Sequence, residues 1–529
     1  VFVLIIGTAV LAGCTNLDET IYSSYTDENF PSSPKQYASM TGPIYVAAQK
    51  LFDNNLYELQ EMGTDEIIVP TRGGDWYDGG RYVDMHYHNW TPSHVLVTNA
   101  WNTGFNAIGT CNQVLNQFEN LEDTDDKEKT VAEIKIMRAW FYYNMMDAYG
   151  NIPIVTKFDQ SVDAPTVNSR KEVFDFIANE IEENAILLDE EATALNYGRP
   201  TQGMAYTLAA KLYLNAEVYV GQPMWKKAEE YCNKVIELNQ YTLGDYFEMF
   251  KPDNGADEKE IIFAVPFDSN KATGNRWQLR TLHFSHRNTF SLTATPYNGW
   301  CVAPGFFDSY QEEDIRKKVF LWGQQYDANG NPMEYSGVNV WLDPYGFDAF
   351  DVGGADDKGR LVGARCIKYY PDKDGTGGWA NNDFVVFRYG DVLMMKAEAL
   401  IRQGKDLSTA IDLVNQIRGR AFPNNQEQLF KESSFNLDSL YDERGREFVW
   451  EMHRRTDMIR FGKFEDPLLF KPSTSGEEYR RIFPIPTSAI MSNPNSSIHH
   501  FKILMYRHMN IHIPQFLLLL IRCHLCIYT

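Results

Sequence analysis

The side chains best suited to chemistry lie in a loop rich in glycine and aromatic residues, between residues 71 and 90. Trp76 and Tyr77 stand in it among Gly and Asp residues, and Trp90 closes it. A sugar offers a flat face of C–H groups with hydroxyls at its rim, so a sugar site needs aromatic platforms beside planar polar side chains. We predict that these rings bind a ligand. The alternative is that they pack the loop onto neighbouring helices.

Polar side chains accompany these rings. Asp65 precedes the loop, Arg72 and Asp75 lie within it, and Arg81 follows a few residues later. Carboxylates accept hydrogen bonds from hydroxyls, and guanidinium groups donate to them. The predicted ligand site therefore includes Asp65, Arg72 and Arg81.

A second irregular stretch, residues 269–380, carries further aromatic side chains. By the same reasoning Trp277, Trp300 and Trp341 are predicted ligand-binding rings, with packing in the core as the alternative for each. The stretch also contains Tyr297, Trp322, Tyr345 and Trp379. Long loops held on a rigid scaffold usually carry function.

Charged residues recur every four positions near the end of the chain, at Glu443, Glu447, Glu451 and Arg455. One interpretation is a pair of catalytic carboxylates, as in a glycosidase. The favoured interpretation is a ladder of ion pairs on successive helical turns that orients neighbouring helices. The chain contains no Gly-x-Ser-x-Gly, His-Glu-x-x-His or phosphate-binding glycine loop, so no enzyme class and no cofactor are indicated.

The first residues indicate a targeting segment. Residues 1–10 form an apolar run too short to span a bilayer comfortably. The run ends in Leu11-Ala12-Gly13-Cys14. Small residues before a cysteine are typical of lipoprotein cleavage, so residues 1–13 are predicted to be a signal peptide, truncated at its start, and Cys14 to carry the lipid. The alternative is an ordinary secretory signal.

Length and charge narrow the classes of partner. A chain of 529 residues exceeds the size of a single core, which predicts two halves or an elongated helical array. The formal net charge of −22 repels phosphate backbones, so nucleic acid is excluded as a partner. Aromatic residues make up 14% of the chain, a high fraction that indicates a specific role for flat side chains. The seven cysteines show no disulfide framework.

Helical patterns supply the scaffold that must hold the loops. Residues 133–149 are apolar on almost every side, which predicts a buried helix stopped by Gly150 and Pro153. The next helix is predicted to open at Ser169, with Glu172 three residues later in a capping box.

Two later stretches have the pattern of a helix, a short turn and a second helix. Residues 204–220 are followed by 228–236, and residues 392–401 are followed by 410–417. Small residues at the predicted crossings favour stacked pairs of the tetratricopeptide type, and a generic pair of antiparallel helices is the alternative.

Motifs in this order resemble the SusD/RagB family of outer-membrane nutrient-binding lipoproteins. The first are the segments 133–154, 169–177, 209–217 and 260–264. The later ones are the segments 387–393, 443–448, 454–462 and 483–486. Each motif is weak alone, but their order holds over most of residues 14–495.

The resemblance implies a mainly α-helical protein, with a tetratricopeptide-like superhelix of helical pairs packed against an irregular, loop-rich ligand-binding half. It implies a cell-surface protein that binds oligosaccharide and passes it to a SusC-like TonB-dependent barrel in the outer membrane, without catalysis. A surface glycoside hydrolase and a protein-interaction scaffold with peptide cargo are the alternative functions.

The same resemblance divides the chain. Residues 14–30 are the lipidated tether, 31–220 the N-terminal region with helical repeats, and 221–495 the C-terminal region with the long loop insertion. Residues 496–529 depart from the family pattern and are predicted to be a disordered or frame-shifted tail that folding does not need. Its rival interpretation, a metal site at Cys523, His524 and Cys526, lacks the second pair of ligands that zinc requires.

Overall fold

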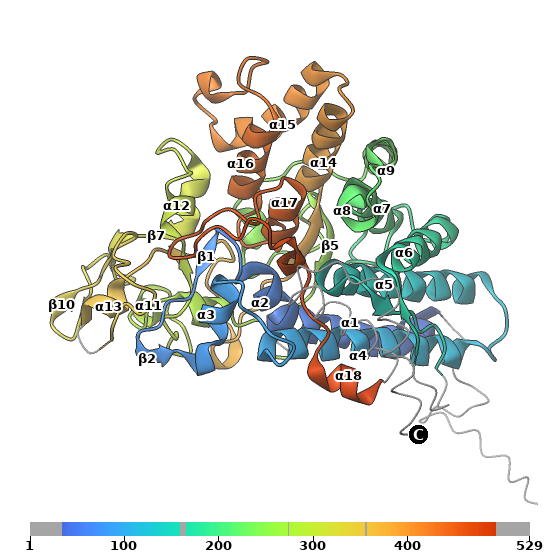
Figure 1. Ribbon diagram of the computed structural model, residues 1–529, viewed down its shortest axis with the longest axis horizontal. Coiled ribbons are helices and arrows are strands. Elements are labelled where there is room, and N and C mark those ends of the chain that lie inside the picture. Colours follow the sequence, from blue (N-terminus) through green and yellow to red (C-terminus); the bar gives the residue numbers. More distant parts are fainter. Residues whose placement is uncertain (1–33, 159–164, 273, 355–356, 494–529) are drawn as a thin grey trace, which may run out of the picture.

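The computed structural model describes residues 34–158, 165–272, 274–354 and 357–493, which form a mainly helical body (Figure 1). Helices make up one side of it, and short strands and long loops make up the other. This arrangement confirms the predicted fold class of helical pairs packed against an irregular half. Cys14, the tether and the 496–529 tail lie outside the described residues.

Long helices form the scaffold. They are α1 (Pro34–Lys50), α4 (Val95–Phe118), α5 (Asp125–Tyr149), α6 (Arg170–Asn184), α7 (Gln202–Leu214), α9 (Trp225–Glu237), α14 (Tyr389–Arg402), α15 (Leu407–Ala421) and α16 (Leu437–Phe448). The shorter ones are α2 (Leu56–Glu61), α3 (Arg81–His86), α8 (Ala216–Val220), α10 (Trp277–Thr281), α11 (His286–Thr289), α12 (Pro304–Phe307), α13 (Asp357–Leu361), α17 (Arg454–Arg460) and α18 (Thr487–Ser492). A π-helical turn, Leu51–Asn55, joins α1 to α2.

The two predicted helix pairs are present, and they lie side by side. α7 packs on α9 and α14 packs on α15, while α14 also packs on α9, so the second pair continues the stack begun by the first. Lys211 of α7 and Asp391 of α14 form an ion pair of 2.7 Å across this stack. The predicted helix 204–220 is interrupted at Asn215, whose side-chain amide donates to Lys211 O, and it divides there into α7 and α8.

Capping and burial explain α5 and α6. As predicted, α5 is buried on almost every side along its second half. It ends at Gly150, whose φ of 71° glycine adopts without steric cost. The Ser169 hydroxyl accepts the Glu172 N–H at 3.3 Å, and the Glu172 carboxylate accepts the Ser169 N–H at 2.7 Å, so the predicted capping box is confirmed.

Strands are short and pair antiparallel in twos. The longest pair, β5 (Ile261–Val265) with β13 (Phe384–Arg388), is buried along its whole length. The other pairs are β1 (Ile67–Ile68) with β6 (Cys301–Val302), β3 (Ile152–Pro153) with β4 (Val167–Asn168), β7 (Phe320–Leu321) with β12 (Arg365–Cys366), β8 (Gly323–Gln324) with β11 (Trp341–Leu342), and β9 (Glu334–Tyr335) with β10 (Val338–Asn339). Strand β2 (Gly73–Trp76) lies within the 71–90 loop.

Aromatic rings fill the boundary between the helical half and the irregular half. Phe52 stacks on Trp140 of α5 at 4.9 Å and meets Phe384 of β13 at 5.6 Å. Trp140 also meets Phe263 of β5 edge to face at 5.1 Å. Because each ring buries a large apolar area, much of the aromatic content stabilises this boundary.

Asp383, which directly precedes β13, leads to a stability prediction. Its Oδ1 accepts the Phe267 N–H at 2.8 Å, and burial raises the pKa of its carboxyl to about 7. At Asp383 the folded state therefore keeps a proton that the unfolded chain releases near pH 4, so the contribution of Asp383 to stability should fall as the pH rises from about 4 to 7. Asp383→Asn should abolish that fall and gain ~1 kcal/mol or more in unfolding free energy over the wild type between about pH 4 and pH 8, measured by urea titration.

Asp257 is exposed, so Asp257→Asn serves as the matched control and should show the same difference from the wild type at both pH values. An Asp383→Asn difference that does not change with pH would contradict the prediction.

Candidate ligand-binding site

Trp76 stands at the centre of the first group of candidate side chains. Its Nε1–H donates to Tyr297 O at 2.8 Å, which ties the 71–90 loop to the second irregular stretch. Its ring lies against Gly299, where an added Cβ would stand 2.1 Å from the ring atom Cζ2. A larger residue at 299 would therefore displace the ring. Trp76 is half-buried and fixed in orientation.

Two exposed tyrosines are linked to Trp76 through the backbone. Tyr77 follows it in the chain, Tyr297 accepts its hydrogen bond, and their exposed fractions are 54% and 48%. Arg81 lies over the Tyr82 ring at 4.7 Å, and Tyr82 in turn meets the Trp76 ring at 5.7 Å. We call Trp76, Tyr77 and Tyr297 the Trp76 surface. The structure thus brings together three predicted residues, Trp76, Tyr77 and Arg81, and adds Tyr297.

A second group of exposed rings lies beyond α12. Trp341 of β11, a predicted residue, is 58% exposed and stands opposite Gln324 of β8. Trp322 and Tyr345 are also exposed, and both meet the Phe307 ring edge to face. We call Trp322, Trp341 and Tyr345 the Trp341 surface.

Tyr297 and Tyr345 were not selected from the sequence, although a signal for them exists. Pro296 and Asn298 flank Tyr297, and Pro344 and Gly346 flank Tyr345. Turn-forming residues on both sides of a ring favour a bend at the protein surface, where the ring stays exposed.

Trp277 and Trp300 do not face solvent, which corrects their prediction as surface rings. Trp277 is buried beside Tyr369 and Phe384, at 4.7 and 5.2 Å. Trp300 is fully buried and stacks on Tyr57 at 5.5 Å. Both rings belong to the aromatic boundary between the two halves, because residues from distant parts of the chain cover them.

Arg72 and Trp90 are also buried, so the structure does not expose them to a ligand. Arg72 donates to Val362 O at 3.0 Å and to Cys301 Sγ at 3.1 Å, and burial lowers its pKa to about 10. Trp90 packs against His88 of the same loop and against other core rings. Arg72 fixes the loop to β6, and Trp90 fixes it to the core.

The carboxylates of the charged series are buried and paired. Glu443 and Glu447 share Arg316, at 2.9 Å each, and Glu447 and Glu451 share Arg388, at 2.8 Å each. Burial alone would raise the pKa of Glu443, but Arg316 and two further arginines lower it to about 2. Such a group cannot hold the proton that a glycosidase acid must donate near neutral pH. The carboxylates are ion-paired as predicted, but the ladder on successive turns of one helix is wrong, because the main partners, Arg316 and Arg388, come from distant elements.

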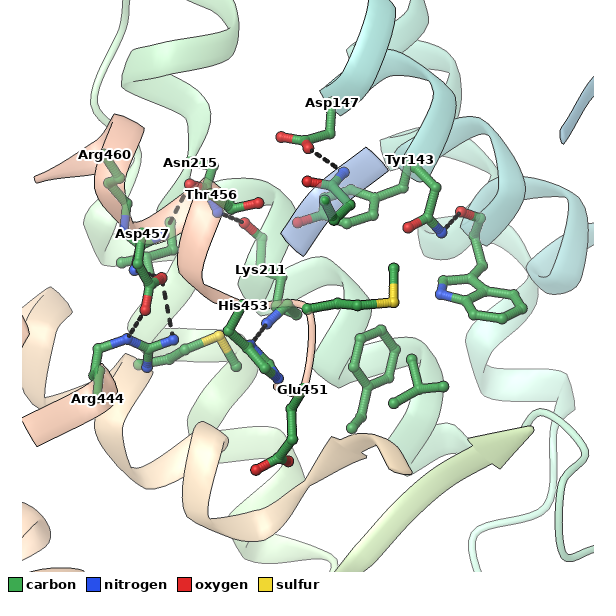
Figure 2. A pocket seen from close by; sticks show the side chains of 18 of the residues that line it. Tyr143, Asp147, Lys211, Asn215, Arg444, Glu451, His453, Thr456, Asp457 and Arg460 are labelled. Atoms are coloured by element: carbon green, nitrogen blue, oxygen red, sulfur yellow. Dashed lines mark hydrogen bonds and ion pairs between the residues drawn. The ribbon is translucent and has the colours of Figure 1, made fainter. Parts of the chain in front are cut away.

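A small cavity of about 50 Å³ lies where α7, α14 and α17 approach one another (Figure 2). Lys211 donates to Asp391 at 2.7 Å and to His453 Nδ1 at 3.0 Å. Burial and the charge of Lys211 hold the pKa of His453 well below its usual range, so the ring is neutral. Arg444 completes the pairing of Asp391 at 2.9 Å. The charged groups around this small cavity are paired with one another, so we interpret it as a structural ion cluster.

Across the described part of the chain, no group of His, Cys, Asp or Glu side chains could hold a metal ion. No helix within that part has the length and apolar character needed to cross a membrane. The alternative metal ligands Cys523, His524 and Cys526 lie outside it.

Two family models match long parts of the chain. One, described as the SusD family, matches residues 259–497, and one described as "Starch-binding associating with outer membrane" matches residues 17–214. The chain belongs to the SusD family. The SusD matches cover both the helical pairs and the loop-rich half, in the order in which the resemblance placed its motifs.

Relatives in the SusD family cover most of the chain. The starch-binding protein SusD of Bacteroides thetaiotaomicron is 28% identical, over 84% of this chain and 85% of the relative. A SusD-like protein of Bacteroides ovatus is 24% identical, over 94% of this chain and 88% of the relative.

Solved structures of the SusD superfamily share the fold. A Parabacteroides distasonis member superposes with a TM-score of 0.71 at 22% identity, over 88% of this chain and 98% of that one. Surface glycan-binding protein A of Bacteroides thetaiotaomicron, solved with laminarihexaose, superposes with a TM-score of 0.70 at 20% identity, over 87% of this chain and 98% of that one. This chain therefore shares the overall fold of these two proteins.

Proposed function

We propose that this chain binds oligosaccharides at the cell surface, through the Trp76 surface and the Trp341 surface. The observation that carries the proposal is the Trp76 ring, fixed by its hydrogen bond to the Tyr297 carbonyl, together with the exposed side chains of Tyr77 and Tyr297. A starch-binding relative and a superfamily member solved with laminarihexaose support a glycan as the ligand.

A large aromatic side chain in water loses the hydrophobic contribution that burial would give, so a group of exposed rings is typical of a binding surface. Sugar rings can cover them with C–H faces while their hydroxyls stay hydrogen-bonded to water or to side chains such as Arg81. A net charge of −22 makes a neutral glycan a better partner than an anionic polymer.

The proposal includes binding without catalysis. The carboxylates that suggested a glycosidase, Glu443, Glu447 and Glu451, are buried in ion pairs away from solvent. A glycoside hydrolase is the alternative, and release of reducing ends from starch or laminarin by purified protein would support it. A protein scaffold is the third class, and it would retain partner binding while showing no affinity for any glycan on an array.

Affinity electrophoresis tests the proposed function directly. The purified protein should migrate more slowly in native gels cast with soluble starch or laminarin than in gels without polysaccharide, relative to a non-binding marker protein. Unchanged migration in both polysaccharides and in a wider glycan array would contradict glycan binding.

The proposal places the protein on the outer membrane as the capture partner of a SusC-like TonB-dependent transporter. The description of the model that matches residues 17–214 supports outer-membrane association. Co-purification of a TonB-dependent barrel with the tagged full chain from membranes would support the partnership, and its absence under mild detergent would contradict it.

Cys14 is proposed to anchor the chain through a lipid, because it follows the apolar run directly. Cys14→Ser should move the protein from the membrane fraction to the soluble fraction and abolish labelling by a fatty-acid analogue. Cys111→Ser, at a buried cysteine, is the matched control and should stay with the membranes. Unchanged fractionation and labelling of Cys14→Ser would contradict the anchor.

A further inference from the structure

A cleft of about 300 Å³ opens between the segment before β1, helices α12 and α16, and residues 467–469. Its lining includes Asp65, one of the ligand-binding residues predicted from the sequence, and Asp442. The Trp76 surface and the Trp341 surface contribute none of its lining side chains. We call it the Asp65 cleft.

A buried arginine fixes the carboxylate of Asp65. Arg454 donates from Nε and Nη2 to the two oxygens of Asp65, at 2.7 and 2.8 Å. The guanidinium lies 3.9 Å over the Tyr441 ring, and its Nη1 donates to Tyr441 O at 3.1 Å. The Arg454 side chain is 5% exposed and that of Asp65 is 31% exposed. The oxygens of Asp65 are therefore held in a fixed position with free acceptor capacity on the open side.

The negative charge of Asp65 is balanced by Arg454, which also lines the cleft. Arg454 matches Asp65, and burial raises the pKa of the Asp442 carboxyl, although part of that side chain reaches solvent. The cleft therefore offers acceptors from Asp65, whose charge Arg454 balances, from the exposed carboxylate of Asp442 and from the Ser309 hydroxyl. Hydrogen-bond donors such as sugar hydroxyls suit that set of acceptors.

Most of the remaining wall is apolar. Ala303, Phe306, Pro467, Leu468 and Leu469 form this part, and the polar residues Thr64 and His86 also line the cleft. An apolar wall opposite fixed carboxylate acceptors matches the C–H face and the hydroxyl rim of a sugar, and the volume lies at the small end of ligand pockets.

Helix α12 separates the cleft from the Trp341 surface. Phe306 lines the cleft, whereas the next residue, Phe307, supports Trp322 and Tyr345 on the other side. The Tyr345 hydroxyl donates to Asp308 at 2.6 Å, directly before Ser309 of the cleft. The two sites are neighbours with separate linings.

We propose that the Asp65 cleft is a binding site for a single sugar ring, independent of the exposed aromatic surfaces. Asp65 and Asp442 accept hydrogen bonds from its hydroxyls, and the apolar wall packs on its C–H face. The site discriminates by the positions of the hydroxyls, because its acceptors are fixed by Arg454.

Gly305 allows the cleft to be filled without removing any contact. It lines the cleft, and an added Cβ would meet no atom within 4 Å. Gly305→Trp therefore places a ring in the space proposed for the sugar. Gly109 of α4 is equally open but lies outside the cleft, so Gly109→Trp is the matched control.

Saturation-transfer NMR with glucose, galactose, mannose, xylose and N-acetylglucosamine, each titrated separately, tests the proposal. At least one of them should give a saturable signal that Gly305→Trp abolishes and Gly109→Trp keeps. Asp442→Asn, which leaves Arg454 paired, should weaken the same sugar about tenfold, the usual effect of losing a hydrogen bond to a charged group. Melting curves show whether each variant is folded.

Three outcomes overturn the proposal: no saturable signal from any of the five sugars, a signal that survives in folded Gly305→Trp, or a signal unchanged in Asp442→Asn. A signal that disappears in Tyr77→Ala or Trp341→Ala instead would assign the sugar to the aromatic surfaces. Oligosaccharide binding by Gly305→Trp, measured in parallel, separates failure of the cleft from failure of the proposed function.

Discussion

Replacing Arg388 by methionine should lower the free energy of unfolding by about 3–5 kcal/mol, the usual effect of removing one partner from a buried ion pair. Arg388 is 1% exposed in its side chain and bonds Glu260, Glu447 and Glu451 at 2.7 to 2.8 Å. Methionine fills much of the volume but leaves these carboxylates buried with fewer positive partners. Urea titration of the folded chain measures the change.

Arg81→Met is the matched control. The Arg81 side chain is 32% exposed, and its ion-pair partner Asp78 is also partly exposed. That variant should lose ~1 kcal/mol or less. If Arg388→Met lost no more than Arg81→Met, the buried network would not hold β13 against α16.

The helical scaffold follows from local rules, and the sequence therefore predicts it well. The capping box at Ser169 and Glu172 and the stop at Gly150 depend on neighbours within a few residues. The two helix pairs need only an apolar stripe and a turn between the helices. Their stacking through α9 and α14 follows because each pair has an apolar face to cover.

The charged series shows where local rules end. Spacing by four residues predicted neighbours on one helix from Glu443 to Arg455. Instead α16 ends at Phe448, and Trp450 and Met452 adopt φ values of 59° and 63°, which turn the chain away. The positive partners then come from other elements, as Arg316 does for Glu447. A pattern of charges within one segment cannot specify partners more than a hundred residues away.

The sequence could not distinguish exposed candidate rings from buried ones, because burial also depends on residues far away in the chain. Trp277 and Trp341 both lie in irregular stretches without periodicity, so the sequence gives them equal status. The structure buries Trp277 among rings from β13 and exposes Trp341 on a two-stranded edge. Burial in such stretches depends on long-range packing, and only turn residues next to a ring, as at Tyr297, indicate exposure locally.

Removing both exposed tyrosines of the Trp76 surface should have the largest effect on ligand binding. Tyr77 and Tyr297 are about half exposed, so Tyr77→Ala/Tyr297→Ala should remove two stacking rings at little cost in stability. Stacking of bases on aromatic side chains contributes ~1–3 kcal/mol per ring, and a similar effect for sugars would weaken binding by roughly 30-fold to 1000-fold or more for the pair. Tyr479→Ala, at another exposed tyrosine, is the matched control.

Calorimetric titration of the wild type, Tyr77→Ala/Tyr297→Ala and Tyr479→Ala with maltoheptaose and laminarihexaose is the most direct test of glycan binding by the exposed rings. The account predicts saturable binding of at least one of these glycans by the wild type and by Tyr479→Ala. It predicts no measurable heat from the double variant, whose melting temperature should match that of the wild type. Equal affinity in all three proteins, or loss of binding only together with loss of folding, would contradict it.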